Sequence, residues 1–551
     1  MNPKLRASQS AGSGRTALIV AAVLALGAWS VEAAQETVQV SSNLARSTTA
    51  PELQAVEGKV KLRLDDAISI ALERNLSLQV QRYDRERSRL GIEQALGMYD
   101  FSLTSSAQAS SDTSPAASNL DGAEVQKSDR LGLQLGLSRL VPTGGVADVA
   151  WSNSRLKTNS SFALVNPSYN SGLDFTFSQP LLRDFGKAVT ERPIVIARNG
   201  DELSRLAFVQ RVTDLLRDVE NAYWSLIDAR YQLEVAQASL DLARQLHEQN
   251  RVRVEVGTLA PLELVQSEVG ISTREEEIIR AQLGVGDAED RLRQLLGLDR
   301  GDLWSAEIVP ETAPETSPYP IAIEKAIDTA LQERPEVAIK RVTRQNLAVD
   351  AAYYRNQTLP RLDVRAIYGF NGVGGDVILT DSLGHPIGVD TGGWGDAVQQ
   401  VADANYRGWS LGVSFAYPLQ NRTARAKSAQ ANLQLSQNDT EMKELELGVS
   451  TEVRSAARLV EAAAKAIETA RASRRLAEKN LEAEQKKYEN GLSTSFQVLQ
   501  IQDELTSARS RLANAVTGYR KALVVFHRAT GRLVPESGVE VVSDPIPAKS
   551  R

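Results

Sequence analysis

The sequence predicts a mainly α-helical protein that also carries a membrane β-barrel, with each chain built as a tandem duplication. Three observations support this prediction. One proline-free stretch of more than sixty residues contains a heptad repeat sustained over five heptads, separate stretches alternate apolar and small polar residues, and the whole pattern occurs twice. Heptad spacing is typical of packed helices and alternation is typical of strands with two different faces.

The heptad repeat lies between Ala424 and Asn490, which contains no proline. Its first series is Met442, Val449, Ala456, Ala463, Ala470 and Ala477, and its second is Val453, Val460, Ile467 and Leu481, with Arg474 as the break. A helix of this length is about 100 Å long, because each residue adds 1.5 Å. Charged residues lie between the apolar positions, so we expect water along part of the helix.

The N-terminus resembles a secretory signal peptide. Lys4, Arg6 and Arg15 precede the apolar run Ala17–Trp29, and small residues follow. We expect cleavage near Ala33 or Ala34, and a retained membrane anchor is the alternative, although the run is short for one.

Composition excludes several functions. The net charge of −6 and the lack of a basic cluster argue against nucleic-acid binding. The chain has no cysteine, and His247, His385 and His527 have no partners at metal-ligand spacing. We therefore expect no cofactor, no metal and no enzymatic activity. The glycines at 372–375 and 392–395 do not fit a phosphate-binding loop.

Two pairs of matching segments reveal the duplication. Ala67 to Leu78 reads AISIALERNLSL, and Ala326 to Val337 reads AIDTALQERPEV, at an offset of 259 residues. Residues in the later part of each copy, such as Gly257 and Gly491, match at an offset of 234 residues. Because the matches keep one order, a single unit occurs twice, with extra material in the first copy.

Each copy predicts a helix, strands, a long helix, a turn and a return helix. The first helices are Leu64–Met98 and Ile323–Thr358, the long helices Arg192–Val256 and Ala424–Asn490, the turns Gly257–Pro261 and Gly491–Ser495, and the return helices Leu262–Gly297 and Phe496–Gly531. We expect the first and return helices to stack end to end beside the long one. The predicted boundaries are 1–34 signal peptide, 35–63 flexible lead-in, 64–301 first repeat, 302–322 linker, 323–533 second repeat and 534–551 tail.

The predicted strands have one apolar and one small polar face. They are Phe101–Ser110, Leu131–Leu140, Val146–Arg155 and Leu173–Leu181 in the first copy, and Leu362–Phe370 and Gly408–Tyr417 in the second. This alternation is typical of a half-buried sheet or of a membrane barrel, and the two small, separated groups favour a barrel closed by several chains. The expected lipid-facing residues are Leu133, Leu135, Phe175, Phe177, Trp409, Leu411, Phe415 and Tyr417.

The first copy holds an additional hairpin around residues 142–145, which either widens the barrel or folds outside it. We expect extracellular loops at Ser111–Lys127, Asn159–Asn170 and Asn371–Arg407.

The order of these elements resembles that of the TolC-like outer-membrane efflux protein family. The helix starts at Ala71–Asn75 and Ala330–Glu336, the strand exits at Gln179–Gly186 and Tyr417–Leu419, and the turns at Gly257 and Gly491 resemble that family's motifs. The resemblance covers residues 64–533. It implies a homotrimer with one β-barrel in the outer membrane and one α-helical barrel across the periplasm. It also implies a passive exit duct, coupled by a periplasmic adaptor protein to an inner-membrane pump that selects the cargo, in tripartite efflux or type I secretion.

The turns between the helices are the expected sites of adaptor contact. Gly257 and Gly491 are predicted to take left-handed backbone angles. The expected contact residues are Gly257, Thr258, Leu259, Ala260, Gly491, Leu492, Ser493 and Thr494. Some relatives carry carboxylates at the entrance, where this chain has Gln497 and Gln500, with Glu263 and Gln266 in the first copy. Glu263 is either an entrance charge or a solvated charge at a helix start.

A second interpretation remains. The same heptads suit a non-conducting periplasmic coiled-coil scaffold or adhesin, but such a protein has no need of lipid-facing strands.

Overall fold

The computed structural model describes residues 45–46, 57–115, 122–298, 301–380 and 386–541. The predicted signal peptide, most of the lead-in and residues 542–551 lie outside these ranges. The chain divides into two compact units, which are described separately. Residues 90–198 and 346–435 form the sheet unit, and the described parts of 40–89, 199–345 and 436–551 form the helical unit. Within the described ranges, no helix is long and apolar enough to cross a membrane.

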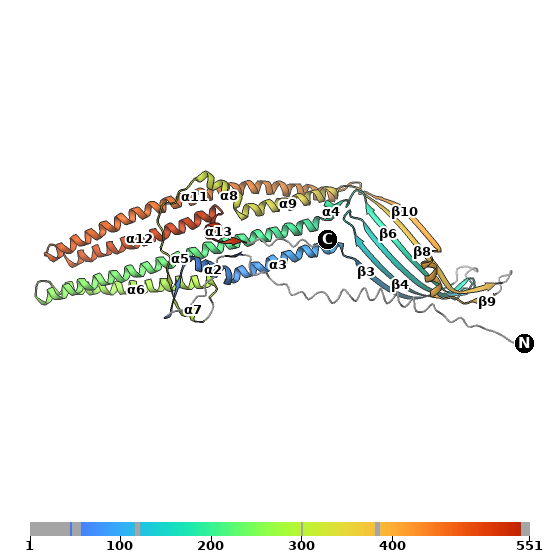
Figure 1. The fold of residues 1–551 in the computed structure, drawn as a ribbon, viewed down its shortest axis with the longest axis horizontal. Helices are drawn as coiled ribbons and strands as arrows, with labels where there is room; N and C mark the ends of the chain where they lie inside the picture. Colours follow the sequence, from blue (N-terminus) through green and yellow to red (C-terminus); the bar gives the residue numbers. More distant parts are fainter. Residues whose placement is uncertain (1–44, 47–56, 116–121, 299–300, 381–385, 542–551) are drawn as a thin grey trace. The chain divides into compact units, whose positions relative to one another are not determined.

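Within the described residues, seven strands form the sheet of the sheet unit (Figure 1). Six lie side by side in the order β10-β8-β6-β5-β4-β3, all antiparallel, and β9 pairs with the end of β8. Their bounds are β3 Ser102–Pro115, β4 Val125–Leu140, β5 Val146–Thr158, β6 Val165–Pro180, β8 Arg361–Thr380, β9 Pro386–Asp390 and β10 Tyr406–Ala416. All six predicted strands are present. The additional hairpin, β4 and β5, lies inside the sheet between β3 and β6.

The predicted loops are wrong in extent. Strand β3 continues to Pro115, β6 begins at Val165 and β8 runs to Thr380, and α10 (Trp394–Ala402) follows β9. The extension of β3 pairs residues such as Ser111 with Asp129. Residues 111–115 of β3 carry no apolar face, so alternation gives no signal there, whereas the β8 extension interrupts its apolar residues with glycines.

The strand register separates two faces of the sheet. One row of successive partners is Trp409, Tyr368, Phe175, Val149, Leu137 and Leu103. The next row, on the other face, is Ser410, Ile367, Thr176, Asp148, Ser138 and Ser102. Because side chains alternate along a strand, one face of the sheet is apolar and the other is largely small and polar.

The helical unit contains most of the long helices. Helices α5 (Arg192–Glu255), α6 (Pro261–Leu296), α11 (Arg422–Glu489) and α12 (Ser495–Ala529) agree with the predicted bounds to within two residues. Its smaller elements are α7 Asp302–Ser305 and α13 Leu533–Glu536, with β2 Lys59–Leu62 parallel to β7 Glu307–Pro310 and β1 Ala45–Arg46 paired with β11 Glu540–Val541. The short helices η1 Gly97–Tyr99 and α4 Lys187–Thr190 belong to the sheet unit.

The first helix of each repeat is broken, where the sequence predicted one continuous helix. Asn75 separates α2 (Leu64–Arg74) from α3 (Leu76–Leu96), and Arg334 separates α8 (Ile323–Glu333) from α9 (Pro335–Asn356). Both residues have extended backbone angles. The return helices end against these breaks, since Gly297 lies against the backbone of Arg74 and Gly531 against that of Arg334. The end of each return helix therefore meets a break within the first helix.

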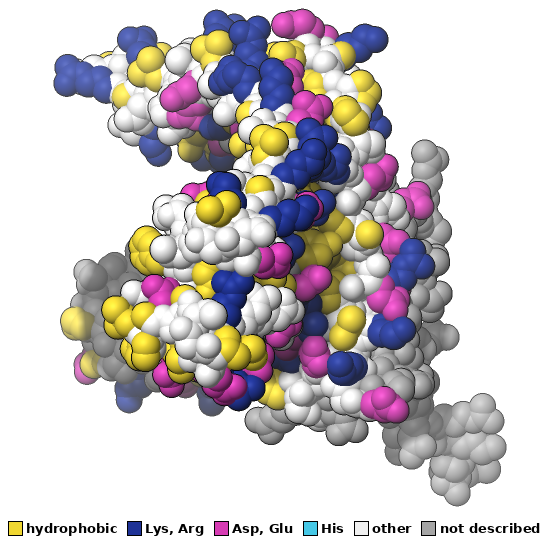
Figure 2. All heavy atoms as spheres, turned by 90° about the vertical axis from the view of Figure 1, so that its left-hand side faces the viewer, with side chains coloured by type: hydrophobic (Ala, Val, Ile, Leu, Met, Phe, Trp, Pro, Cys, Tyr) yellow, Lys and Arg dark blue, Asp and Glu magenta, His cyan; other side chains and the backbone are white. Residues whose placement is uncertain are grey.

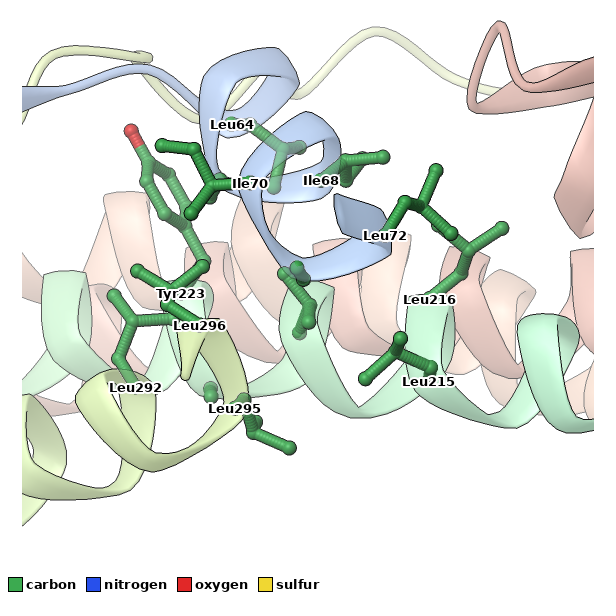
Figure 3. Packing of buried hydrophobic residues seen from close by; sticks show 14 of the residues in the cluster. Leu64, Ile68, Ile70, Leu72, Leu215, Leu216, Tyr223, Leu292, Leu295 and Leu296 are labelled. Carbon is green, nitrogen blue, oxygen red and sulfur yellow. The ribbon is translucent and has the colours of Figure 1, made fainter. Parts of the chain in front are cut away.

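Helix α2 packs into the main hydrophobic core (Figure 3). Its apolar side chains lie over α5 and against the end of α6. The labelled residues are Leu64, Ile68, Ile70 and Leu72 of α2, Leu215, Leu216 and Tyr223 of α5, and Leu292, Leu295 and Leu296 of α6. Each fully buried side chain of this size stabilises the fold by about 1.5–3 kcal/mol.

A second cluster confirms the heptad prediction for α11. Val449, Val453, Val460 and Ile467 are all buried there, against side chains from α8 and α12. The small residues Ala456 and Ala457 are also buried, which is consistent with close approach of the neighbouring helices.

Candidate functional site at the hairpin turns

Two sharp turns join the long helices to their return helices. The first tip is defined as Val256–Ala260 between α5 and α6, and the second tip as Asn490–Thr494 between α11 and α12. Gly257 and Gly491 have φ angles of 76° and 74°, which confirms the left-handed prediction. The N–H of Thr258 bonds the carbonyl of Arg253 at 2.9 Å, and that of Leu492 bonds Lys487 at 2.9 Å. Both helices therefore end in the same Schellman turn.

The return helices begin with different caps. Pro261 occupies the first turn of α6, where its missing N–H costs nothing. At α12 the hydroxyl of Thr494 accepts a hydrogen bond from the N–H of Gln497 at 3.3 Å. Between turn and helix, Leu492 is 78% exposed, and Leu262 and Phe496 are also exposed. Figure 2 views the molecule from the end that carries both tips, and hydrophobic side chains are visible there beside charged ones of both signs.

The two tips of one chain are joined by polar contacts. The guanidinium of Arg253 donates to the carbonyls of Tyr488 and Glu489 at 3.0 and 3.1 Å and lies 4.6 Å from the Tyr488 ring centre. The Tyr488 hydroxyl donates to Asn250 at 2.5 Å, and both residues are buried. These contacts hold the end of α5 against the end of α11.

Glu263 takes part in the same linkage. Its carboxylate accepts a hydrogen bond from the hydroxyl of the buried Ser495, so it joins the start of α6 to the start of α12. The carboxylate of Glu263 is half-buried and bonded to the second tip, which differs from the expected solvated charge, and its role as an entrance charge stays a prediction. Its position in the first turn of α6 still favours a negative charge.

The other expected entrance residues do not form one cluster. Gln497 is exposed near the second tip. Gln266 and Gln500 line a cavity of about 600 Å³ between α6 and α12, in which Val265, Phe496 and Leu499 also take part. The buried Oε1 of Gln266 has no hydrogen-bond partner among the described residues.

An ion pair between a buried arginine and an exposed aspartate lines this cavity. The side chain of Arg274 is only 5% exposed and lies 2.5 Å from the Asp503 carboxylate, with further bonds to Ser239 at 3.1 Å and to the Gly270 carbonyl at 3.0 Å. The pair fixes α6 against α12, and Gly270 permits the close approach, because a side chain there would meet Leu499 at 3.2 Å.

Sequence reasoning missed two polar residues that hold the ends of the long helices. Asn250 and Glu484 are equivalent in the two copies, and each makes a side-chain contact close to a tip. Glu484 accepts hydrogen bonds from Ser493 at 2.5 Å and Lys487 at 3.0 Å, which hold the pKa of its carboxyl below the ordinary value. The signal available was the pair of matching polar positions seven residues before each turn glycine.

No metal site appears among the described residues, in which no group of three or more His, Cys, Asp or Glu side chains could hold an ion. His247 contacts Ser267 at 2.9 Å, and burial lowers the pKa of His527. His385 lies outside the described residues.

The expected lipid-facing residues share one face of the sheet. Register partners place Leu133, Leu135, Phe175, Phe177, Trp409, Leu411 and Phe415 on the apolar face. Tyr417 lies one residue beyond the end of β10.

Comparison with known proteins identifies the class. The family model described as "Outer membrane efflux protein" matches residues 143–298 and 326–532, one match in each repeat. The chain belongs to this family, the TolC-like efflux proteins of the outer membrane, which confirms the resemblance, the fold class and the outer-membrane location.

Solved structures share this fold. The outer-membrane channel OprN has a TM-score of 0.62 and 16% identity, covering 85% of this chain and 89% of its own. The Campylobacter jejuni CmeC channel has a TM-score of 0.59 and 15% identity, covering 91% of both chains. The Vibrio cholerae outer membrane protein VceC has a TM-score of 0.60 and 15% identity, covering 85% of this chain and 96% of its own. No curated protein sequence gives a significant match.

Proposed function

We propose that three copies of this chain form a passive exit duct across the outer membrane and the periplasm. A periplasmic adaptor would couple the duct to an inner-membrane pump, in tripartite efflux or type I secretion. The observation that carries the proposal is a sheet with one apolar and one polar face in a chain that also holds helices of 64 and 68 residues. Such a sheet suits lipid outside and water inside.

The sheet supports a shared barrel. Within the described residues, β3 and β10 each have a partner strand on one side only. Lipid forbids unpaired backbone groups, and a sheet from one chain can satisfy them by pairing with further copies. Lipid on the apolar face then replaces the hydrophobic contacts that the sheet of a soluble protein makes within its core.

The two tips are the proposed contact with the adaptor. They carry exposed apolar side chains, Leu262, Leu492 and Phe496, at the ends of rigid helices. The contacts around Arg253 and Glu263 hold both tips of a chain together, so an adaptor would meet a preformed surface. The residues that line the cavity between α6 and α12 would add to the surface that the adaptor contacts.

The barrel is tested by charge placed on each face of β10. Val413→Arg puts a cation on the apolar face near the middle of the apolar band and should cost about 2–4 kcal/mol, which blocks assembly. Ser414→Arg puts the same cation on the polar face and should assemble normally. Membrane fractionation and native mass in detergent provide the readout. Equal assembly of both variants would contradict a lipid-facing sheet.

The competing function is a non-conducting coiled-coil scaffold or adhesin, which the exposed heptad surfaces of α11 favour. For this function the wild-type protein would be a periplasmic monomer or dimer, and Val413→Arg would leave it unchanged. An outer-membrane trimer excludes it.

The adaptor contact is tested separately. Leu492→Glu removes exposed apolar surface at the second tip and should reduce efflux several-fold, with trimer yield unchanged. Leu433→Glu, on another exposed leucine of α11 outside the tips, is the matched control. Normal efflux by Leu492→Glu would rule out this leucine as an adaptor contact.

A further inference from the structure

We propose that every copy contributes six strands to the barrel wall, and that β3 of one copy pairs with β10 of the next. Three copies of six strands then close a barrel of eighteen strands, with the additional hairpin β4–β5 inside the wall. This inference rests on the proposed trimer and adds the seam between copies and the width of the passage.

The outer edges of the sheet are more exposed than its middle. All eleven residues of β10 are exposed on both faces, and nearly all of β3 is as well. Phe415 on β10 is 67% exposed, whereas Phe175 on the interior strand β6 is 43% exposed. Apolar side chains at both edges therefore lack a lateral neighbour, which the same surface of another copy would supply.

The chain direction allows the two edges to pair. Strand β3 runs away from the helices, because it follows η1 and α3, and β10 runs back toward them, because it precedes α11. The β3 edge of one copy and the β10 edge of another are therefore antiparallel. This continues the pattern of the sheet, in which every neighbouring pair is antiparallel.

The apolar band crosses the sheet at a slant. On β10 it runs from Phe415, nearest the helices, to Trp409, and on β4 it runs from Leu137 to Leu131. Trp409 and Leu137 lie in the same row of register partners. Trp409, the apolar residue of β10 farthest from the helices, is therefore level with Leu137, the apolar residue of β4 nearest to them. The apolar band thus shifts by six residues over the four strand spacings from β10 to β4.

This shift gives the strand tilt. Six residues at about 3.3 Å over four spacings of about 4.8 Å correspond to a slope of about 45°. A lipid band must be level with the membrane, so the strands tilt by that angle, close to the 35–45° of membrane barrels. The slanted apolar band continues across β4 and β5, which is expected only if this hairpin belongs to the barrel wall.

The same shift predicts the register of the seam. It amounts to about one and a half residues per strand, as the slope requires. If the same shift continues across the seam between two copies, Ala109 of β3 lies opposite Leu411 or Val413 in β10 of the next copy. The backbone diameter would be about 40 Å, against about 26 Å for a twelve-stranded barrel without the hairpin, from strand spacing and tilt.

Cysteine pairs test the seam in the full-length chain, which has no cysteine of its own. Ala109→Cys combined with Leu411→Cys or Val413→Cys should form disulfides between copies, visible as covalent dimers and trimers without reductant. Leu133→Cys with Asn153→Cys, register partners within one chain, is the control and should form a disulfide inside each copy.

The outcomes separate this inference from the proposed function. A trimer in which neither Ala109 pair forms a disulfide, while the Leu133–Asn153 control pair does, would overturn the inference alone. Electron microscopy of the wild-type trimer gives an independent width, and a β region about 26 Å across would also overturn it. Absence of any outer-membrane trimer would overturn the proposed function first.

Discussion

The two helix breaks, at Asn75 and Arg334, reach the same geometry with different side chains. Their φ and ψ angles are −63° and 119°, and −67° and 128°. Each side chain donates to the equivalent carbonyl of its return helix, Asn75 to Leu295 at 2.9 Å and Arg334 to Ala529 at 3.4 Å. The duplicated chain has therefore kept the contact and changed the residue that makes it.

A second arginine is common to both breaks. Arg82 donates to the carbonyl of Leu72 at 3.1 Å, and Arg341 donates to that of Leu331 at 2.9 Å. Both donors and both acceptors are related by the same 259-residue offset. These guanidinium groups satisfy carbonyls at the ends of α2 and α8, which have lost their helical partners.

The difference lies in what begins the next helix. The carboxamide of Asn75 accepts from the N–H groups of Ser77 and Leu78 at 3.1 and 3.2 Å, as a helix cap. In the second repeat Pro335 starts α9 and disfavours helical angles at the residue before it. Position 334 is then free of the capping role, and arginine there can enter an ion network.

That network joins four elements. Arg334 lies 2.6 Å from Glu452 and 3.3 Å from Glu336, and Arg528 lies 3.1 Å from Glu452 and 3.4 Å from Asp214. The first break depends on a neutral amide, and the second on charges contributed by α5, α9, α11 and α12. We therefore expect the second break to be the more sensitive to mutation.

Replacing Arg334 should have the largest effect. Arg334→Met leaves Glu336 and Glu452 without their buried partner and should lower the free energy of unfolding by about 3 kcal/mol. Arg344→Met, which breaks the exposed pair with Asp439, is the control and should change little. Denaturant melts of the detergent-solubilised protein measure both. Equal melts would show that the network contributes no stability.

Replacing the glycines that end the return helices, Gly297 and Gly531, should have the next largest effect on stability, and the two replacements should differ in size. Both have left-handed angles, so alanine costs about 1–2 kcal/mol at either. At Gly297 an added Cβ would also meet the Arg74 carbonyl oxygen at 2.7 Å, whereas at Gly531 the nearest atom is at 3.3 Å. Gly297→Ala should therefore destabilise the protein more than Gly531→Ala, by thermal melting. The reverse order would mean that the backbone at Arg74 yields more easily than that at Arg334.

Asn75→Ala should cost about 1–2 kcal/mol, because it removes a helix cap and leaves the Leu295 carbonyl unpaired. Adding Leu76→Pro places a proline at the position equivalent to Pro335 of the second repeat and should restore part of the lost stability. The Leu76→Pro single variant is the control for the proline itself. A double variant less stable than Asn75→Ala would show that the two breaks are not interchangeable.

Much of this fold could be predicted from sequence, because its signals are periodic. Val453 and Val460 of the heptad series are buried, as predicted, and Phe175 and Phe415 lie on one face of the sheet, as their alternation predicted. The breaks were missed although Pro335 stood in the predicted helix, because the apolar pattern continues across it. The contacts between Arg253, Glu263 and the second tip join residues more than 200 positions apart, and no local pattern reports such pairs.

The smallest effect should be a difference in pH dependence. Burial alone would raise the pKa of Glu336, but the hydrogen bond from Arg334 and the charge of Arg528 outweigh it, so the pKa is lowered from its ordinary value of 4.5. A carboxyl with a lowered folded-state pKa stabilises the fold at neutral pH, and that stability is lost as the pH falls below about 4.5 through the folded pKa. The stability difference between wild type and Glu336→Gln should therefore shrink between pH 6 and pH 3, whereas that between wild type and Asn75→Ala should stay constant, because an amide does not titrate. A difference for Glu336→Gln that did not change with pH would show that this carboxylate gains nothing from its charged neighbours.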